Sequence, residues 1–270
     1  MMRVTVLMDN HTYVDVYYLG EPAVSYWIEA EGKTFLFDVA YSAAFLHNAA
    51  DMSIDVTKAD AIVLSHGHND HTGGLVPFMD VCEGEKPKII CHPCALTPRS
   101  FEGLSIGCPL DQKTVKEQFP LFETKEPYWL TEKLVFLGEI PRILSFEKPY
   151  PIGILEEEGG NQEDMLLDDT ALAYSTEGGV FIITGCSHAG ICNIIEYAKK
   201  ITGKEKVLGV LGGFHLFGID KRTKETISYL AKEQIPDLYP CHCTSFRVRA
   251  ALDRQCPLQE VGVGLVLNWE

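Results

Sequence analysis

Residues 64–74 read Leu64-Ser65-His66-Gly67-His68-Asn69-Asp70-His71-Thr72-Gly73-Gly74, with three histidines and one aspartate within six positions. They follow the apolar run 61–64, which predicts a short buried strand. Side chains from one tight loop at the carboxyl end of a strand can converge on a single point. Imidazole nitrogens and carboxylate oxygens are ligands that Zn²⁺, Fe and Mn accept. The stretch therefore predicts one half of a metal site and not an ordinary polar turn.

Further histidines stand just past other apolar runs, which predicts that they lie at the same edge of a sheet. These histidines are His92, His188, His215 and His242. We expect His188 and His242 to be metal ligands. For His92 and His215 two roles stay open, either direct ligation or a contact with a ligand or with substrate. The two remaining histidines, His11 and His47, lack this placement and are expected at the surface or in packing.

Composition bounds the class of protein. With 270 residues the chain can bury a sizeable core, and we expect a single domain over 1–270. The formal net charge of −15 disfavours binding to nucleic acid or to an anionic membrane and leaves a small molecule as the expected partner. No apolar stretch approaches the roughly 20 residues of a membrane span. The start of the chain is not typical of a signal peptide, so we expect a cytoplasmic protein of open oligomeric state.

Nine cysteines without a signal sequence are typical of free thiols in a reducing compartment. Two close pairs, Cys91 with Cys94 and Cys241 with Cys243, resemble halves of a structural zinc site. Neither has a companion pair at the spacing that such a site needs, so we expect none.

Short apolar strands dominate residues 1–80, including 14–18, and strands alternate with helices after residue 170. This pattern predicts an α/β fold with two β-rich layers covered by helices. Prolines interrupt residues 95–164, which predicts a cap or a substrate-facing insertion. Its basic side chains are either phosphate contacts or ordinary solvated charges; they are Arg99, Lys125, Arg142 and Lys148.

The His-x-His-x-Asp-His motif resembles the signature of the metallo-β-lactamase superfamily, and the resemblance covers nearly the whole chain. It implies a four-layer αββα sandwich of two mixed sheets. It also implies a dinuclear site for two divalent metal ions, Zn first and Fe or Mn as alternatives. In that family His66, His68 and one later histidine hold one metal, while Asp70, His71 and a further histidine hold the other. Asp70 is then also the catalytic residue that orients or deprotonates water.

This chain departs from the family pattern at two positions. Asp168 and Asp169 stand where a metal-binding histidine is expected, and Cys186 stands where a bridging aspartate is expected. Each is therefore either a ligand or a residue that holds ligands in place. Asp38 matches the family's first motif, in which the carboxylate braces the His66–His71 loop by hydrogen bonds.

Together with the 185–190, 212–216 and 241–244 motifs, the pattern resembles a branch whose members are named 7,8-dihydropterin-6-methyl-4-(β-D-ribofuranosyl)aminobenzene 5′-phosphate synthase. Two enzymatic functions follow from the resemblance. The first is a metal-dependent hydrolase of a small phosphorylated or otherwise anionic substrate. The alternative is a transferase that joins a dihydropterin-methyl diphosphate to an aminobenzene ribotide. A metal-binding sensor without turnover is the third hypothesis.

Overall fold

The computed structural model describes residues 1–157 and 159–270, which form two compact units. Unit 1 comprises Met1–Lys125, Tyr150–Asp168 and Gly262–Glu270; unit 2 comprises Glu126–Pro149 and Asp169–Val261. The expected insertion 95–164, of which residue 158 lies outside the described part, is divided between the units. Its expected role as a cap stays a prediction, as does the single domain.

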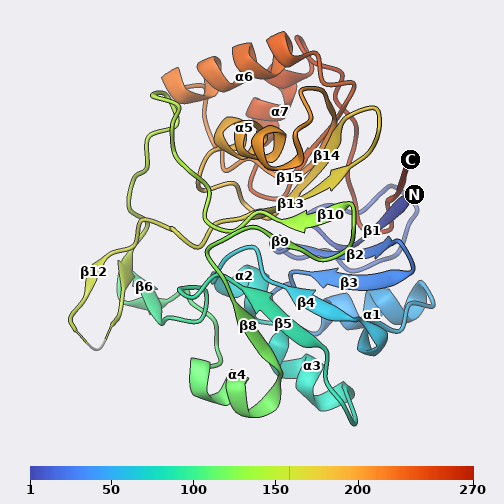
Figure 1. The fold of residues 1–270 in the computed structure, drawn as a ribbon, viewed down its shortest axis with the longest axis vertical. Helices are drawn as coiled ribbons and strands as arrows, with labels where there is room; N and C mark the ends of the chain where they lie inside the picture. The colour runs from blue at the N-terminus through green and yellow to red at the C-terminus, as the bar shows by residue number, and fades with distance from the viewer. Residues whose placement is uncertain (158) are drawn as a thin grey trace. The chain divides into compact units, whose positions relative to one another are not determined.

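Unit 1 contains a mixed sheet (Figure 1) whose strands run in the order β17 (Val266–Trp269), β1 (Met2–Met8), β2 (Ser25–Ala30), β3 (Lys33–Phe37), β4 (Ala61–Val63), β5 (Lys88–Cys91) and β8 (Leu121–Glu123). β4 forms as predicted, since each of its three side chains is buried and apolar. The strands from β3 to β8 are parallel, so their carboxyl ends share one edge of the sheet.

The helical elements of unit 1 are α1 (Ala44–Asp51), η1 (Val56–Lys58), α2 (Asn69–Thr72), α3 (Leu75–Val81) and α4 (Gln112–Gln118). α3 begins directly after Gly73-Gly74, and it buries Leu75 and Phe78 in the core of unit 1. A small sheet completes the unit, in the order β12 (Gln162–Glu163), β11 (Ile154–Leu155), β6 (Arg99–Phe101) and β7 (Leu104–Ser105).

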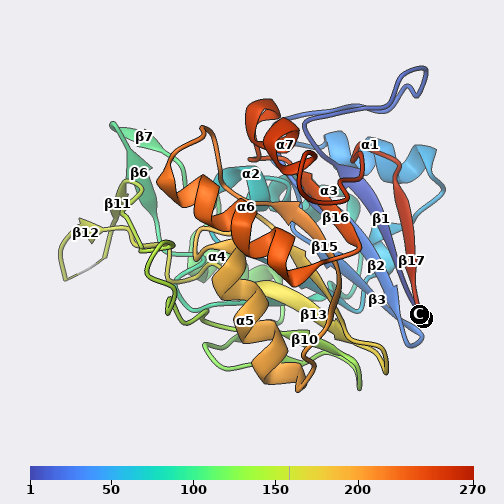
Figure 2. The ribbon, with the colours of Figure 1, turned by 90° about the horizontal axis from the view of Figure 1, so that it is seen from above.

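Unit 2 contains a second mixed sheet, in the order β16 (Asp237–Cys241), β15 (Val207–Gly213), β14 (Val180–Thr184), β13 (Ala171–Ser175), β10 (Leu134–Phe136) and β9 (Tyr128–Trp129). β14, β15 and β16 are parallel, so the residues that follow them share one edge. The helices are α5 (Ile191–Thr202), α6 (Lys221–Glu233) and α7 (Phe246–Leu252). α5 packs on β13 and β14 and against α6 (Figure 2). Two mixed sheets with helices confirm the predicted α/β class.

α5 begins directly after the Cys186–Gly190 turn, and a distant carboxylate holds its first turn. Glu147 is buried and accepts the N–H groups of Cys192 and Asn193 at 3.1 and 2.8 Å. An anion at a helix N-terminus satisfies donors that have no partner within the helix. This contact fixes the end of the turn that carries His188.

One predicted strand is wrong. Residues 14–18 lie in an irregular segment, and Val14 and Tyr17 are each 90% exposed. An apolar run forms a strand only where it can pair with a neighbouring strand and pack on a core.

Among the described residues, no helix has the length and hydropathy to cross a membrane.

Candidate metal centre

Within unit 1, the predicted ligands of the 64–74 stretch lie together. The turn after β4 carries His66 and His68, and α2 carries Asp70 and His71. The His66 Nε2 and His68 Nδ1 atoms are 3.0 Å apart, and the rings of His66 and His71 have centroids 4.2 Å apart. The Nε2 atom of His71 lies 3.5 Å from Asp70 Oδ2. The sequence motif thus folds into one cluster of nitrogen and oxygen donors.

Asp38 braces this cluster from the end of β3. Its carboxylate accepts the N–H and O–H groups of Ser65, each at 2.7 Å, and its Oδ2 lies 2.7 Å from His71 Nδ1. Asp38, Ser65 and His71 are fully buried. A carboxylate at Nδ1 fixes the tautomer and leaves the Nε2 lone pair for a metal ion. This is the role that the resemblance implied for Asp38.

Asp168 braces the same loop from the other side. Its Oδ2 accepts the Gly67 N–H at 2.8 Å, and its carboxylate pairs with Arg99 through Nη1 at 3.3 Å and Nη2 at 3.0 Å. Arg99 Nη1 also lies 3.1 Å from Asp164 Oδ2. Burial opposes ionisation of Asp168, but the Arg99 guanidinium and the Gly67 N–H outweigh it and lower the carboxyl pKa. Of the two roles left open for Asp168, these contacts favour holding the ligand loop over ligation.

Arg99 differs from the expectation of a phosphate contact at the surface. Its side chain is 1% exposed and is committed to two buried carboxylates and to the Cys94 carbonyl oxygen. The other three basic candidates are closer to solvent: Lys125 and Lys148 are exposed, and Arg142 is half-buried. Sequence reasoning missed Asp164 and the link from Arg99 to Gly67, because nothing in the local pattern separates these charges from solvated ones.

His68 is neutral at physiological pH. Burial lowers its pKa to about 3, and the nearby Arg99 charge acts in the same direction. A metal ion binds the neutral imidazole, so no proton competes for the ligand atom near pH 7. The buried nitrogen donors of unit 1 together with the Asp70 carboxylate fit Zn²⁺, Fe²⁺ or Mn²⁺.

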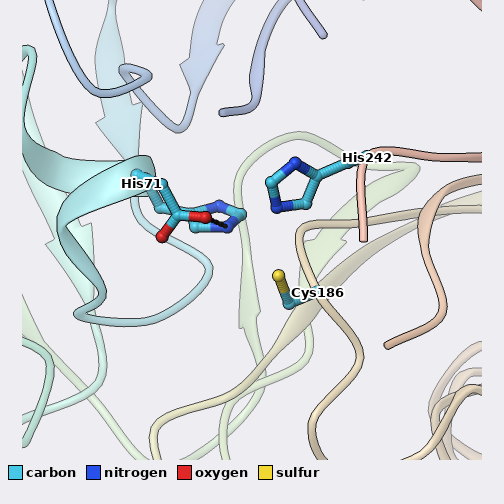
Figure 3. A group of neighbouring side chains, drawn as sticks. His71, Cys186 and His242 are labelled. Carbon is cyan, nitrogen blue, oxygen red and sulfur yellow. Dashed lines mark ion pairs between the residues drawn. The ribbon is translucent and has the colours of Figure 1, made fainter. Parts of the chain in front are cut away.

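Unit 2 brings together the other predicted residues at the carboxyl ends of its parallel strands. Cys186 and His188 follow β14, His215 follows β15, and His242 follows β16. The rings of His188 and His215 have centroids 4.1 Å apart. Cys186 Sγ and a ring nitrogen of His242 lie within 4.8 Å of each other (Figure 3).

Asp169 acts within unit 2 on the turn that carries His188. Its Oδ2 accepts the Ala189 N–H at 2.9 Å, and its side chain is buried. This contact favours holding the turn in place, as Asp168 does in unit 1.

His92, in unit 1, accepts the Cys94 N–H through Nδ1 at 3.1 Å, which engages that nitrogen in a local turn.

Cys243 was not predicted as a site residue, yet it lies in the same region of unit 2. Burial opposes ionisation of its thiol, but hydrogen bonds with Cys186 and His215 and the nearby His242 lower its pKa well below the usual range. The only sequence signal was its place directly after His242.

A cavity of about 430 Å³ opens beside the ligand loop of unit 1. His68 and Asp70 line it together with the apolar or aromatic side chains of Tyr41, Phe101 and Ile152. Its volume is within the range of small-molecule sites.

The sequence is similar to those of known proteins. The model of the Metallo-beta-lactamase superfamily matches residues 19–86. A 7,8-dihydropterin-6-methyl-4-(beta-D-ribofuranosyl)-aminobenzene-5'-phosphate synthase of Methanocaldococcus jannaschii is 32% identical over 261 residues, which cover 91% of this chain and 88% of that protein. An uncharacterised protein of the same organism is 31% identical over 93% of this chain and 94% of its own length.

A solved structure is similar over the whole chain. It is a metal-dependent hydrolase of the beta-lactamase superfamily, with a TM-score of 0.85, 25% identity and coverage of 100% of this chain and 99% of that one. A diphosphatase of the PhnP family shares the fold at a TM-score of 0.53 and 16% identity, over 100% and 98% of the two chains.

Proposed function

Because the chain belongs to the metallo-beta-lactamase superfamily, we propose that it is a metal-dependent hydrolase of a small phosphorylated or otherwise anionic ester. The observation that carries the proposal is the cluster of three buried histidines, His66, His68 and His71, with the half-buried Asp70, the neutral state of His68 and the Asp38 brace. A polar turn without a ligand has no need for such a brace.

We assign two divalent cations to the site, with zinc as the first choice. In unit 1 they would be held by His66, His68, Asp70 and His71, and the superfamily pattern adds two later histidines, for which His188 and His242 are the candidates. Their place after parallel strands supports the last two assignments. Bound cations lower the pKa of a water molecule towards 7 and polarise the ester under attack. Cys186 is a further candidate ligand, because thiolates bind zinc.

The residues around the cavity would have separate roles in hydrolysis. Asp70 would accept a proton from the attacking water, since its carboxylate lies 3.5 Å from His71 Nε2 and lines the cavity. The apolar wall formed by Tyr41, Phe101 and Ile152 binds the uncharged part of the substrate and excludes bulk water. Asp38 and Asp168 keep the ligand loop in one geometry.

The experiment is a turnover assay on metal-loaded protein with a chromogenic phosphate monoester, a phosphate diester and a lactone. The proposal predicts turnover of at least one ester class, lost on chelation and in His68→Ala. Turnover that survives in His68→Ala would contradict the assigned site. The sensor hypothesis would be favoured by a protein that binds the metals, turns over none of these three compounds and forms no joined pterin–aminobenzene product.

The second candidate is a transferase, favoured by the 32% identity to a protein named as a synthase. Here the site holds a diphosphate leaving group while an aminobenzene ribotide attacks the methyl carbon of a dihydropterin-methyl diphosphate. Incubation of the protein with both compounds separates the candidates, because a transferase forms the joined product and a hydrolase releases pterin alcohol or phosphate. Lys125, Arg142 and Lys148 are the candidate phosphate contacts.

A further inference from the structure

Three potential metal ligands of unit 2 stand at equivalent places on three neighbouring parallel strands. Cys186 follows β14, His215 follows β15 and Cys243 follows β16. Each offers one ligand atom, two sulfurs and one imidazole nitrogen, and the three atoms lie within 4.8 Å of one another. Cys186 and Cys243 are 57 positions apart in the sequence, so the fold and not a local motif brings them together.

The backbone around Cys243 is shaped to admit its sulfur. A Cβ atom at Gly213 would lie 2.4 Å from Cys243 Sγ and 2.7 Å from the Gly185 carbonyl oxygen, so any other residue at position 213 would displace the thiol or the loop. The His215 N–H donates to Cys243 Sγ at 3.3 Å, and the Cys243 thiol donates to the Cys186 carbonyl oxygen at 3.5 Å. These contacts hold the sulfur between the turns that follow β14 and β15.

The turns themselves are tied together. Ser187 donates through Oγ to the Gly213 carbonyl oxygen at 2.6 Å, and the Phe214 N–H donates to Thr244 Oγ1 at 2.9 Å. Ser187, Gly213 and Thr244 are buried. The three ligands are therefore presented by turns that hydrogen-bond to one another and not by independently mobile loops.

We propose that Cys186, His215 and Cys243 form a binding site for a thiophilic divalent cation, with zinc as the natural occupant. Two thiolates and one imidazole are a donor set that selects zinc and its softer analogues over Mg²⁺ or Ca²⁺. In a tetrahedral zinc site with Zn–S distances of about 2.3 Å, the sulfurs stand roughly 3.8 Å apart. The three ligand atoms, all within 4.8 Å of one another, are close enough for such a site, and water would fill the fourth position.

This site shares one candidate ligand, Cys186, with the proposed hydrolytic site. Its ligands come from unit 2, and two of them, His215 and Cys243, have no part in the ligand set assigned above. Binding of a cation there would cross-link the ends of β14, β15 and β16 and so fix the turns that carry His188 and His242.

The test is a titration of reduced, metal-free protein with Co²⁺. Binding is measured by the thiolate-to-cobalt charge-transfer absorption in the near ultraviolet. The wild type is expected to develop this band, and Cys243→Ser and Cys186→Ser to lose about half of its intensity for two equivalent thiolate ligands. The double variant should show none. Cys256→Ser is the matched control, because Cys256 is a buried thiol of the same unit outside the cluster, and it should keep the full band.

His68→Ala separates this proposal from the proposed function. It removes a ligand of the hydrolytic site and should leave unchanged the part of the charge-transfer band that Cys243→Ser removes, because Cys243 belongs to the new cluster alone. The site is overturned if the wild type shows no band, if Cys243→Ser keeps the wild-type intensity, or if thiol counting finds the two cysteines joined as a disulfide under these reducing conditions. Circular dichroism of each variant confirms that a lost band is not a lost fold.

Discussion

His68 is the residue on which the nitrogen-donor cluster of unit 1 depends. Replacement by alanine removes a buried, neutral ligand while leaving the Asp38 brace in place. We expect turnover to fall by at least about 100-fold and zinc affinity to fall with it. Steady-state kinetics and competition with a chromogenic chelator measure the two effects. His47→Ala, which changes an exposed histidine of α1, should leave both at the wild-type value.

Asp168 should contribute to the pH dependence of the free energy of unfolding. Its folded-state pKa is lowered, so its stabilisation is complete above the unfolded-state value near 3.9 and is lost as pH falls through the folded-state pKa. Asp168→Asn leaves Arg99 with one buried partner fewer and should cost about 3 to 5 kcal/mol at neutral pH. Its free energy of unfolding should also fall less steeply with acid than that of the wild type.

Urea unfolding of metal-free protein between about pH 6 and pH 3 measures both quantities. Asp80→Asn, at an exposed carboxylate, is the control and should stay within about 0.5 kcal/mol of the wild type. Equal acid dependence of Asp168→Asn and wild type would contradict the assigned role of Asp168.

At the residue scale, the sequence predicted the nitrogen and oxygen donors of the 66–71 loop. It did not predict the distant residues that hold this loop in place by hydrogen bonds. His66, His68, Asp70 and His71 fall within six positions, so local spacing alone brings them together. The contact between Asp168 and Gly67 joins residues 101 positions apart, and no local periodicity carries that information. Arg99 was misplaced for the same reason, because a buried and a solvated arginine look alike in sequence.

The turn between β4 and α2 requires glycine at position 67. An added Cβ there would lie 2.0 Å from the Ala95 carbonyl oxygen and 2.9 Å from Arg99 Nη2. Gly67→Ala must therefore shift the turn, and we expect a loss of about 1 to 3 kcal/mol in stability together with weakened metal binding. Gly218→Ala is the control, because a Cβ at that position meets no atom within 4 Å. Thermal unfolding and zinc titration of the two variants decide the point; equal behaviour would show that the turn tolerates the side chain.

At the element scale, apolar runs predicted strands wherever the structure supplied neighbours. β4 lies within one residue of its predicted bounds, and strands alternate with helices after residue 170 as predicted. Residues 14–18 have the same strand-like composition, but 14–17 are exposed and the segment belongs to none of the three sheets. Composition therefore predicted strand propensity, whereas pairing with a neighbour decided which runs became strands.

For the whole molecule, metal binding should be coupled to stability. Only the folded chain presents the donors as a cluster, so a metal at about 100 times its dissociation constant adds roughly 2.7 kcal/mol. We expect chelation to lower Tm by several degrees and added zinc to restore it. Differential scanning calorimetry of metal-free and zinc-loaded protein measures the change, with Mg²⁺ as the control cation. A Tm unaffected by zinc would contradict a site formed on folding.

At the same scale, the α/β class followed from strand and helix alternation, whereas the arrangement of strands in the two sheets did not. The family resemblance supplied the fold, and the TM-score of 0.85 to a solved superfamily member confirms it. Physical periodicity cannot specify strand order, because the same alternation fits several sheet topologies.

The most direct test of the central claim is a crystal structure of zinc-loaded protein with anomalous scattering recorded at the zinc absorption edge. We expect anomalous peaks at the His66–His71 loop, coordinated by His66, His68, Asp70 and His71, and a further peak bounded by Cys186, His215 and Cys243. Zinc-loaded crystals with no anomalous peak at the His66–His71 loop would contradict it.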